Sequence, residues 1–187
     1  MGLVHKSFEL RPASSGDLPF VWSLYQDLMK PLTVELLEWN EPGQKRVVEL
    51  ALAQKGTSII VVDALDAGWL QVDEFPDSIY LGQLYLAPSF QNCGVGTAIV
   101  SSLSDRARQA GKSLALDVMK NNRARALYKR LGFQVIGESE YKLKMRWSAH
   151  AQSAGRDSRL SRKVMFRLGD VLQNLLRPFI VEPTVLS

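Results

Sequence analysis

The stretch "LAPSFQNCGVGTAIV", residues 86–100, joins a strand-like apolar run to a run with helical spacing through two glycines and a lone cysteine. A glycine-rich turn between a strand and a helix leaves the first helical N–H groups unpaired and pointing at one spot. The positive end of the helix dipole favours an anion there. The segment Gln91 to Gly96 therefore predicts a binding site for a phosphate group.

The spacing of the glycines separates three nucleotide-binding signatures. The dinucleotide pattern G-x-G-x-x-G does not fit, because Ile99 stands where the third small residue is required. The P-loop pattern does not fit either, because no G-K-S/T follows the glycines. The pattern that remains is Q-x-x-G-x-G, from Gln91 to Gly96.

A second segment, "NNRARALYKRLGF" at residues 121–133, matches the pattern N-x-x-A-x-x-L-Y-x-x-x-G-F. Together, the two segments resemble the acetyl-CoA motif and a later motif of the GNAT superfamily of N-acetyltransferases. They lie about 30 residues apart, in the order that the family shows. The resemblance covers roughly residues 7–147. The matching positions of the second motif are Asn121, Ala124, Leu127, Tyr128, Gly132 and Phe133.

Residue patterns along the chain predict the element order β, α, α, β, β, β, α, β, α, β, β. The first helix is expected to end at Pro31, and the second helical region, residues 33–56, to be interrupted at Pro42. The resemblance implies an α/β GNAT fold, with a central mixed and largely antiparallel twisted sheet of about seven strands flanked by helices. We expect the acetyltransferase domain to span residues 1–147.

Residues 148–187 form a linker and a basic amphipathic helical tail in this interpretation. Their net charge is +3, which leaves +1 for the first 147 residues. Such a helix is marginal alone in water and should bury its apolar stripe against its own domain, a second subunit, a partner protein or an anionic membrane. Protein docking or a homodimer is the favoured use, and the alternatives are an incidental extension and membrane contact. The apolar stripe consists of Leu160, Val164, Leu168, Val171, Leu175 and Phe179.

Composition excludes several other classes of protein. One cysteine and two histidines rule out an internal disulfide and disfavour structural zinc. No signal peptide and no run of roughly 20 apolar residues stands out, so we expect a cytoplasmic protein without a transmembrane segment. The small net charge of the first 147 residues argues against a nucleic-acid partner. No metal is expected.

The resemblance implies where acetyl-CoA would bind. Backbone amides from Gly94 to Thr97 would hold its pyrophosphate, and the strand ending at Leu86 would offer backbone groups to the pantetheine arm. That strand must part from the next one, and Gly82 is a plausible place for the β-bulge that this requires. The expected cofactor-binding residues are Leu84, Tyr85, Leu86, Gln91, Asn92, Cys93, Gly94, Val95, Gly96, Thr97, Asn121 and Tyr128.

The resemblance also assigns catalytic roles. The amine of a small molecule, peptide or protein would attack acetyl-CoA directly in a ternary complex, and Tyr128 would donate a proton to the leaving sulfur. Many relatives carry a glutamate base where this chain has Gln83, which cannot accept a proton. Glu74 ranks first among the carboxylates that could replace it, ahead of Asp73, Glu35 and Glu38, and a water relay is an equal alternative. The alternative function is a non-catalytic acyl-CoA sensor or docking module on the same fold.

Overall fold

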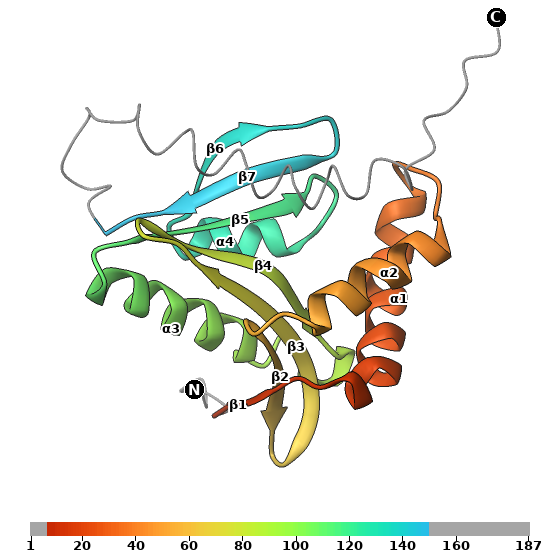
Figure 1. Ribbon diagram of the computed structural model, residues 1–187. Coiled ribbons are helices and arrows are strands. Elements are labelled where there is room, and N and C mark those ends of the chain that lie inside the picture. Colours follow the sequence, from red (N-terminus) through yellow and green to blue (C-terminus); the bar gives the residue numbers. More distant parts are fainter. Residues whose placement is uncertain (1–6, 150–187) are drawn as a thin grey trace, which may run out of the picture.

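A computed structural model describes residues 7–149 of the chain (Figure 1). Seven strands form one sheet in the order β1-β2-β3-β4-β5-β7-β6. The helices and strands occur in the order that the sequence predicts, so this prediction is confirmed. The strands are β1 (Glu9–Pro12), β2 (Thr57–Val62), β3 (Leu65–Glu74), β4 (Ser78–Leu86), β5 (Ser113–Met119), β6 (Gln134–Glu138) and β7 (Lys142–Trp147). The helices are α1 (Leu18–Val34), α2 (Glu41–Leu52), α3 (Val95–Gln109) and α4 (Ala124–Arg130), with 3-10 turns at Ser15–Asp17 and Pro88–Phe90.

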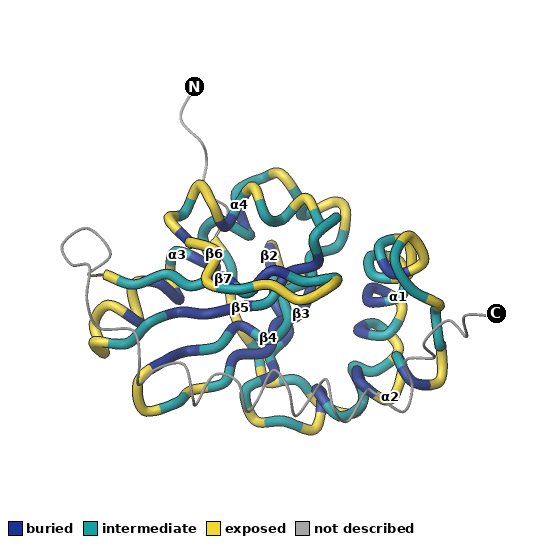
Figure 2. Tube along the Cα trace, turned by 90° about the horizontal axis from the view of Figure 1, so that it is seen from above, coloured by how far each residue is buried: buried dark blue, intermediate teal, exposed yellow. Residues whose placement is uncertain are grey.

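The helices cover both faces of the sheet, and each face has its own apolar core. Successive strand residues point to opposite faces, so Ile59 and Ile60 join different cores although both are fully buried. Ile60 packs in the cluster that contains residues of α3 and α4, and Ile59 in the cluster of α1 and α2. Figure 1 shows α3 and the α1–α2 pair on different sides of the sheet, and Figure 2 shows buried residues running along β3, β4 and β5. The two cores fix the middle of the sheet from both sides.

Two prolines act differently from the prediction. Pro31 does not end the first helix, because α1 continues to Val34 and buries Thr33 after the proline. A proline removes one helical hydrogen bond, and here tertiary packing outweighs that loss. Pro42 does not interrupt a helix but lies in the first turn of α2, where its missing N–H has no helical partner to lose. Asn40 caps this helix by accepting a hydrogen bond from the Gly43 N–H at 3.0 Å.

The strands β4 and β5 are the only parallel pair in the described sheet, and they part midway. Their pairing ends at Leu81 with Leu116. On its other side, β4 pairs with β3 through Gln83 and then through Leu81, so Gly82 is the extra residue of a β-bulge. The expected bulge at Gly82 is thus confirmed. Beyond it, β4 leaves β5 and a gap opens in the sheet.

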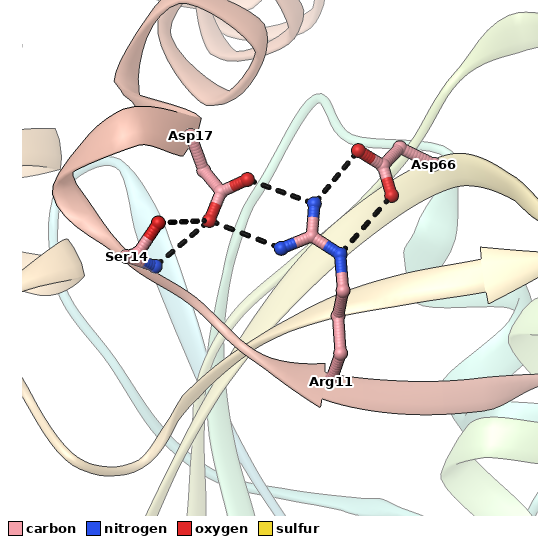
Figure 3. A network of polar contacts seen from close by, with 4 residues as sticks. All are labelled: Arg11, Ser14, Asp17 and Asp66. Carbon is pink, nitrogen blue, oxygen red and sulfur yellow. Dashed lines mark hydrogen bonds and ion pairs between the residues drawn. The ribbon is translucent and has the colours of Figure 1, made fainter.

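An ion-pair network fastens the edge strand to the first helix (Figure 3). Arg11 of β1 donates to Asp17 at 2.8 Å and to Asp66 of β3 at 2.7 Å. Asp17, which precedes α1, also accepts hydrogen bonds from the Ser14 N–H and hydroxyl at 2.8 and 3.0 Å. The guanidinium of Arg11 is the main cause that lowers the pKa of Asp17 from 3.8 to about 2.

We therefore expect Asp17→Asn to destabilise the protein by about 1 kcal/mol at pH 7, a figure reduced for the exposure of Arg11. The folded pKa lies below the unfolded pKa, so the unfolded chain binds more protons as the pH falls. The stabilisation is complete above about pH 5 and disappears as the pH falls through about 2. Urea unfolding from pH 7 to pH 2 should show the difference from the native chain closing over that range.

Asp105→Asn is the matched control, because Asp105 pairs with Arg108 at the exposed surface of α3. It should change the unfolding free energy by less than about 0.5 kcal/mol at every pH. A destabilisation by Asp17→Asn that stays constant from pH 7 to pH 2 would contradict the role given to its charge.

Residues 150–187, which hold nearly all of the predicted amphipathic tail, lie outside the described residues. Within residues 7–149, no helix is both long enough and apolar enough to cross a bilayer.

Candidate functional site

Two cavities meet where β4 leaves β5. The larger, about 590 Å³, lies beside the glycine loop and is called the loop cavity. The smaller, about 260 Å³, lies over the parted strands and is called the sheet cavity. Their common wall consists of Met29, Leu84, Tyr85, Asn122, Ala124 and Tyr128. Groups in this wall can face a ligand in either cavity.

The glycine loop presents backbone amides to the loop cavity. Gly94, with φ of 92°, precedes α3 in the left-handed conformation that glycine adopts most readily. The first helical hydrogen bond runs from the Ala98 N–H to the Gly94 carbonyl at 2.9 Å. The N–H groups of Val95, Gly96 and Thr97 stand before that bond and form the positive end of the helix. These are the backbone groups at which the sequence predicts a phosphate site, and phosphate binding there stays a prediction.

Gln91 braces this loop against both neighbouring elements. Its side-chain amide donates to the Leu86 carbonyl at 2.7 Å and accepts from the Arg123 guanidinium. Arg123 and Arg130 both line the loop cavity, where they add positive charge. The sequence did not single out these arginines, because they occupy variable positions of the second motif.

Two of the predicted cofactor-binding side chains turn away from the cavity. Val95 is fully buried in the core. The thiol of Cys93 donates to the Phe90 carbonyl at 3.0 Å and packs against the same core. These residues can offer only their backbone to a ligand. The remaining predicted residues line the loop cavity, namely Leu84, Tyr85, Leu86, Gln91, Asn92, Gly94, Gly96, Thr97, Asn121 and Tyr128.

The side-chain nitrogen of Asn121 has hydrogen-bond partners, whereas its side-chain oxygen has none within residues 7–149. Its nitrogen donates to the Leu32 carbonyl at 2.9 Å and to the Glu35 carboxylate at 2.7 Å. Its oxygen is buried, and no residue within 7–149 hydrogen-bonds to it. A buried carbonyl oxygen without a donor is costly, so this atom suits an N–H group of a ligand. The helix that follows is capped by Asn122, which accepts from the Ala124 N–H at 2.8 Å.

Tyr128 stands at the junction of the two cavities. It is only 7% exposed, and its ring contacts Phe133 with centroids 5.6 Å apart. Burial raises the pKa of Tyr128 to about 12. The hydroxyl is therefore protonated at neutral pH and available as a proton donor to either cavity.

The structure does not bring Glu74 to this site. Glu74 lies at the far end of β3, opposite Ile79, whereas the cavities lie at the other end of β4. It lines neither cavity and forms ion pairs with Arg106 at 2.7 Å and Lys112 at 3.4 Å. The sequence places Glu74 on a neighbouring strand but gives no register, and the register decides which end it occupies.

Of the other carboxylates named from the sequence, only one lines a cavity. Asp73 lines neither cavity, and burial raises its pKa. Glu35 is engaged by Asn121, whereas Glu38 lines the sheet cavity. Gln83 also lines the sheet cavity, where its carbonyl oxygen accepts a hydrogen bond from the Tyr85 hydroxyl at 2.6 Å.

Residues that the sequence did not indicate complete the sheet cavity. Asp117 follows the last β5 residue paired with β4, and Lys142 begins β7. Neither belongs to a motif, and only the strand order β4-β5-β7 brings them together.

The chain is similar to known proteins in sequence and in fold. Residues 21–133 match the model of the acetyltransferase (GNAT) family. An acetyltransferase from Thermus thermophilus is 15% identical, with a TM-score of 0.61 over 79% of this chain and 99% of that one. The PaiA N-acetyltransferase from Thermoplasma acidophilum, solved in complex with coenzyme A, is 15% identical, with a TM-score of 0.59 over 76% of this chain and 99% of that one.

A third solved structure is only partly covered. The N-acetylglutamate synthase from Neisseria gonorrhoeae, complexed with coenzyme A and N-acetyl-glutamate, is 20% identical, with a TM-score of 0.57 over 77% of this chain and 35% of that one. At such identities these likenesses establish the fold. A search of curated proteins found no match.

Gly96→Val tests the loop as a binding site. A Cβ at Gly96 would lie 3.5 Å from a Leu86 methyl and 3.6 Å from a Leu127 methyl, which are ordinary contacts, so the protein should fold. The added side chain would enter the loop cavity. We expect acetyl-CoA affinity, measured by calorimetry, to fall at least about tenfold, with little change in melting temperature.

Gly137→Val is the control, because nothing lies within 4 Å of a Cβ at this strand position outside both cavities. Its acetyl-CoA affinity should equal that of the native chain. Unchanged affinity in Gly96→Val would rule out the loop as the binding site.

Proposed function

The chain belongs to the GNAT family of acetyltransferases, and on that premise we propose that it transfers an acetyl group from acetyl-CoA to a primary amine of a small molecule or peptide, by direct attack with both substrates bound. One observation supports this proposal above the others. Tyr128, a buried proton donor, lies in the wall shared by the loop cavity and the sheet cavity. Two substrates can therefore meet beside one protonated hydroxyl.

The residues of the loop cavity fit coenzyme A. The amides of Val95, Gly96 and Thr97 would bind its pyrophosphate, since they precede the first hydrogen bond of α3. The open oxygen of Asn121 would accept an N–H group of the pantetheine arm. The cavity, about 590 Å³, is of the size usual for cofactor sites. When bound there, acetyl-CoA supplies an acetyl group activated as a thioester.

The end of β4 would guide the pantetheine arm. Beyond Leu81 this strand has no β5 partner, so one of its edges can pair with an extended ligand. Leu84, Tyr85 and Leu86 all line the loop cavity. A backbone N–H near Leu86 would hydrogen-bond the carbonyl oxygen that is attacked.

Tyr128 would serve as the general acid. A tyrosine with a pKa of about 12 remains protonated throughout the pH range of ordinary assays. Its hydroxyl would donate a proton to the leaving sulfur. Phe133 holds the ring in place from the core side.

The sheet cavity would receive the amine in its neutral form. A lysine-like amine is neutral in only one part in about 2500 at pH 7, which amounts to a handicap of roughly 4 to 5 kcal/mol. Apolar side chains such as Met29 and Leu84 disfavour the charged form there by desolvation. A water relay to Glu38, which lines the same cavity, would carry the proton away.

A second candidate function follows from Gln83. This amide occupies the strand position expected to hold a base, and Glu74 lies outside the site. A non-catalytic acyl-CoA sensor would bind coenzyme A and release no thiol. A screen of thiol release with polyamines, amino acids, aminoglycosides and peptides distinguishes the two functions.

Tyr128→Phe should lower turnover by about 10²-fold while leaving acetyl-CoA affinity within about twofold of the native value, because the ring still packs and only the proton donor is lost. Turnover would be followed by thiol release with the best amine of the screen, and affinity by calorimetry.

Tyr25→Phe is the matched control. Tyr25 is also a buried tyrosine that lines the sheet cavity, but it is not in the wall shared by both cavities, and its hydroxyl donates to Gln44 at 2.6 Å. It should keep turnover within about threefold of the native chain. Full turnover in Tyr128→Phe would assign Tyr128 a purely structural role.

A further inference from the structure

The sheet cavity has a single cation in its wall. Among the described residues that line it, three are charged, namely Glu38, Asp117 and Lys142. Lys142 is the first residue of β7 and pairs with Met119 of β5. A molecule in this cavity therefore meets charges of both signs.

Lys142 is held at this place by its backbone. Its N–H donates to the Ser139 hydroxyl at 3.1 Å, and the Ser139 N–H donates to the Lys142 carbonyl at 2.8 Å. The Lys120 N–H also donates to the Tyr141 carbonyl at 2.8 Å. The turn before β7 is thus fixed to itself and to the end of β5, so the Lys142 side chain starts from a rigid position.

The ammonium group of Lys142 lacks an ion-pair partner within residues 7–149. Two other lysines of the same sheet region behave differently, since Lys112 pairs with Glu74 and Lys120 with Glu138. Burial lowers the pKa of Lys142, and the charge of Asp117 opposes that effect. A partly buried ammonium group without an ion-pair partner gains from a bound anion, because paired charges tolerate burial better than single ones.

The size of the cavity limits what the acceptor can be. At about 260 Å³, the sheet cavity is smaller than most drug-sized ligand sites. Tyr25, Tyr80 and Tyr85 form part of its wall. It suits a molecule of a few heavy atoms more than a folded protein segment.

We propose that the acceptor is a small amine that also carries a carboxylate, such as an amino acid, and that Lys142 binds this carboxylate. The inference rests on the proposed acetyl transfer and names the class of its acceptor. The amino group would lie toward Tyr128, where the two cavities meet. The acidic side chains of Asp117 and Glu38 would attract the acceptor as an ammonium ion, before desolvation and loss of a proton give the neutral amine that attacks.

Conjugates of coenzyme A test this without knowledge of the natural acceptor. The sulfur of coenzyme A is joined through a –CH₂–C(O)– bridge to the nitrogen of glycine or of methylamine, so that the two conjugates differ only by the carboxylate. Alanine with ethylamine and phenylalanine with 2-phenylethylamine give two further pairs. Calorimetry with the full chain should show that the carboxylate conjugate of at least one pair binds at least about tenfold more tightly.

Variants of the chain test whether Lys142 causes the preference for the carboxylate conjugates. Lys142→Met should remove that tenfold preference and change the affinity of the amine conjugates by less than about twofold, whereas Lys142→Arg should retain part of the preference. Lys120→Met is the control, because it removes an ammonium group near Lys142 that lies outside both cavities. It should leave every affinity unchanged.

The outcomes separate the two proposals. If coenzyme A binds but the members of every pair bind equally, or if Lys142→Met weakens both members alike, the acceptor class proposed here is overturned and acetyl transfer still stands. If coenzyme A itself does not bind the native chain, the proposed function fails, and the acceptor class fails with it.

Discussion

The parting of β4 from β5 is the constraint on which the site depends. Their parallel pairing ends at Leu81 and Leu116, and the bulge at Gly82 turns the rest of β4 away. Parallel neighbours need a long crossover, and α3 provides it. The crossover leaves β4 at the parted end, so the turn into α3 lies beside the gap. One break in pairing therefore places an open strand edge next to a helix N-terminus.

The two cores explain why this gap persists in a folded sheet. Unpaired strand ends tend to close or to fray unless their flanks are fixed. Here Ile79 and Leu81 are buried in the core of α3 and α4, while the tilted rings of Trp69 and Tyr85 contact each other, with centroids 5.1 Å apart, beside α1 and α2. Each core holds its side of β4. The polar groups of the gap are thus exposed to the cavities while the strands around them stay packed.

Sequence patterns predicted the parts of the molecule whose signals are local. The element order and the glycine turn follow from residue types within a few positions of each feature. The bulge was expected because the family resemblance requires the strand to part from its neighbour, and a glycine within that strand indicated its place. The proline at position 31 was misjudged because burial of Thr33 is a tertiary effect. Glu74 and Lys142 show the same limit of sequence-based prediction: Glu74 was expected at the site and is absent from it, whereas Lys142 was not expected and lines it. The strand register places Glu74 away from the cavities and Lys142 beside them. This register cannot be predicted from the residues that precede and follow either position.

The side-chain amide of Asn121 also connects the loop cavity with the sheet cavity. Its nitrogen donates to Leu32 and Glu35 at the end of α1, and its buried oxygen has no hydrogen-bond donor within residues 7–149 although the residue lines the loop cavity. The next residues of that segment, Leu37 and Glu38, line the sheet cavity. A substrate that shifts Asn121 in the loop cavity would therefore also shift the segment that lines the sheet cavity. Thermodynamic linkage makes such coupling reciprocal, so each substrate would change the dissociation constant of the other by the same factor.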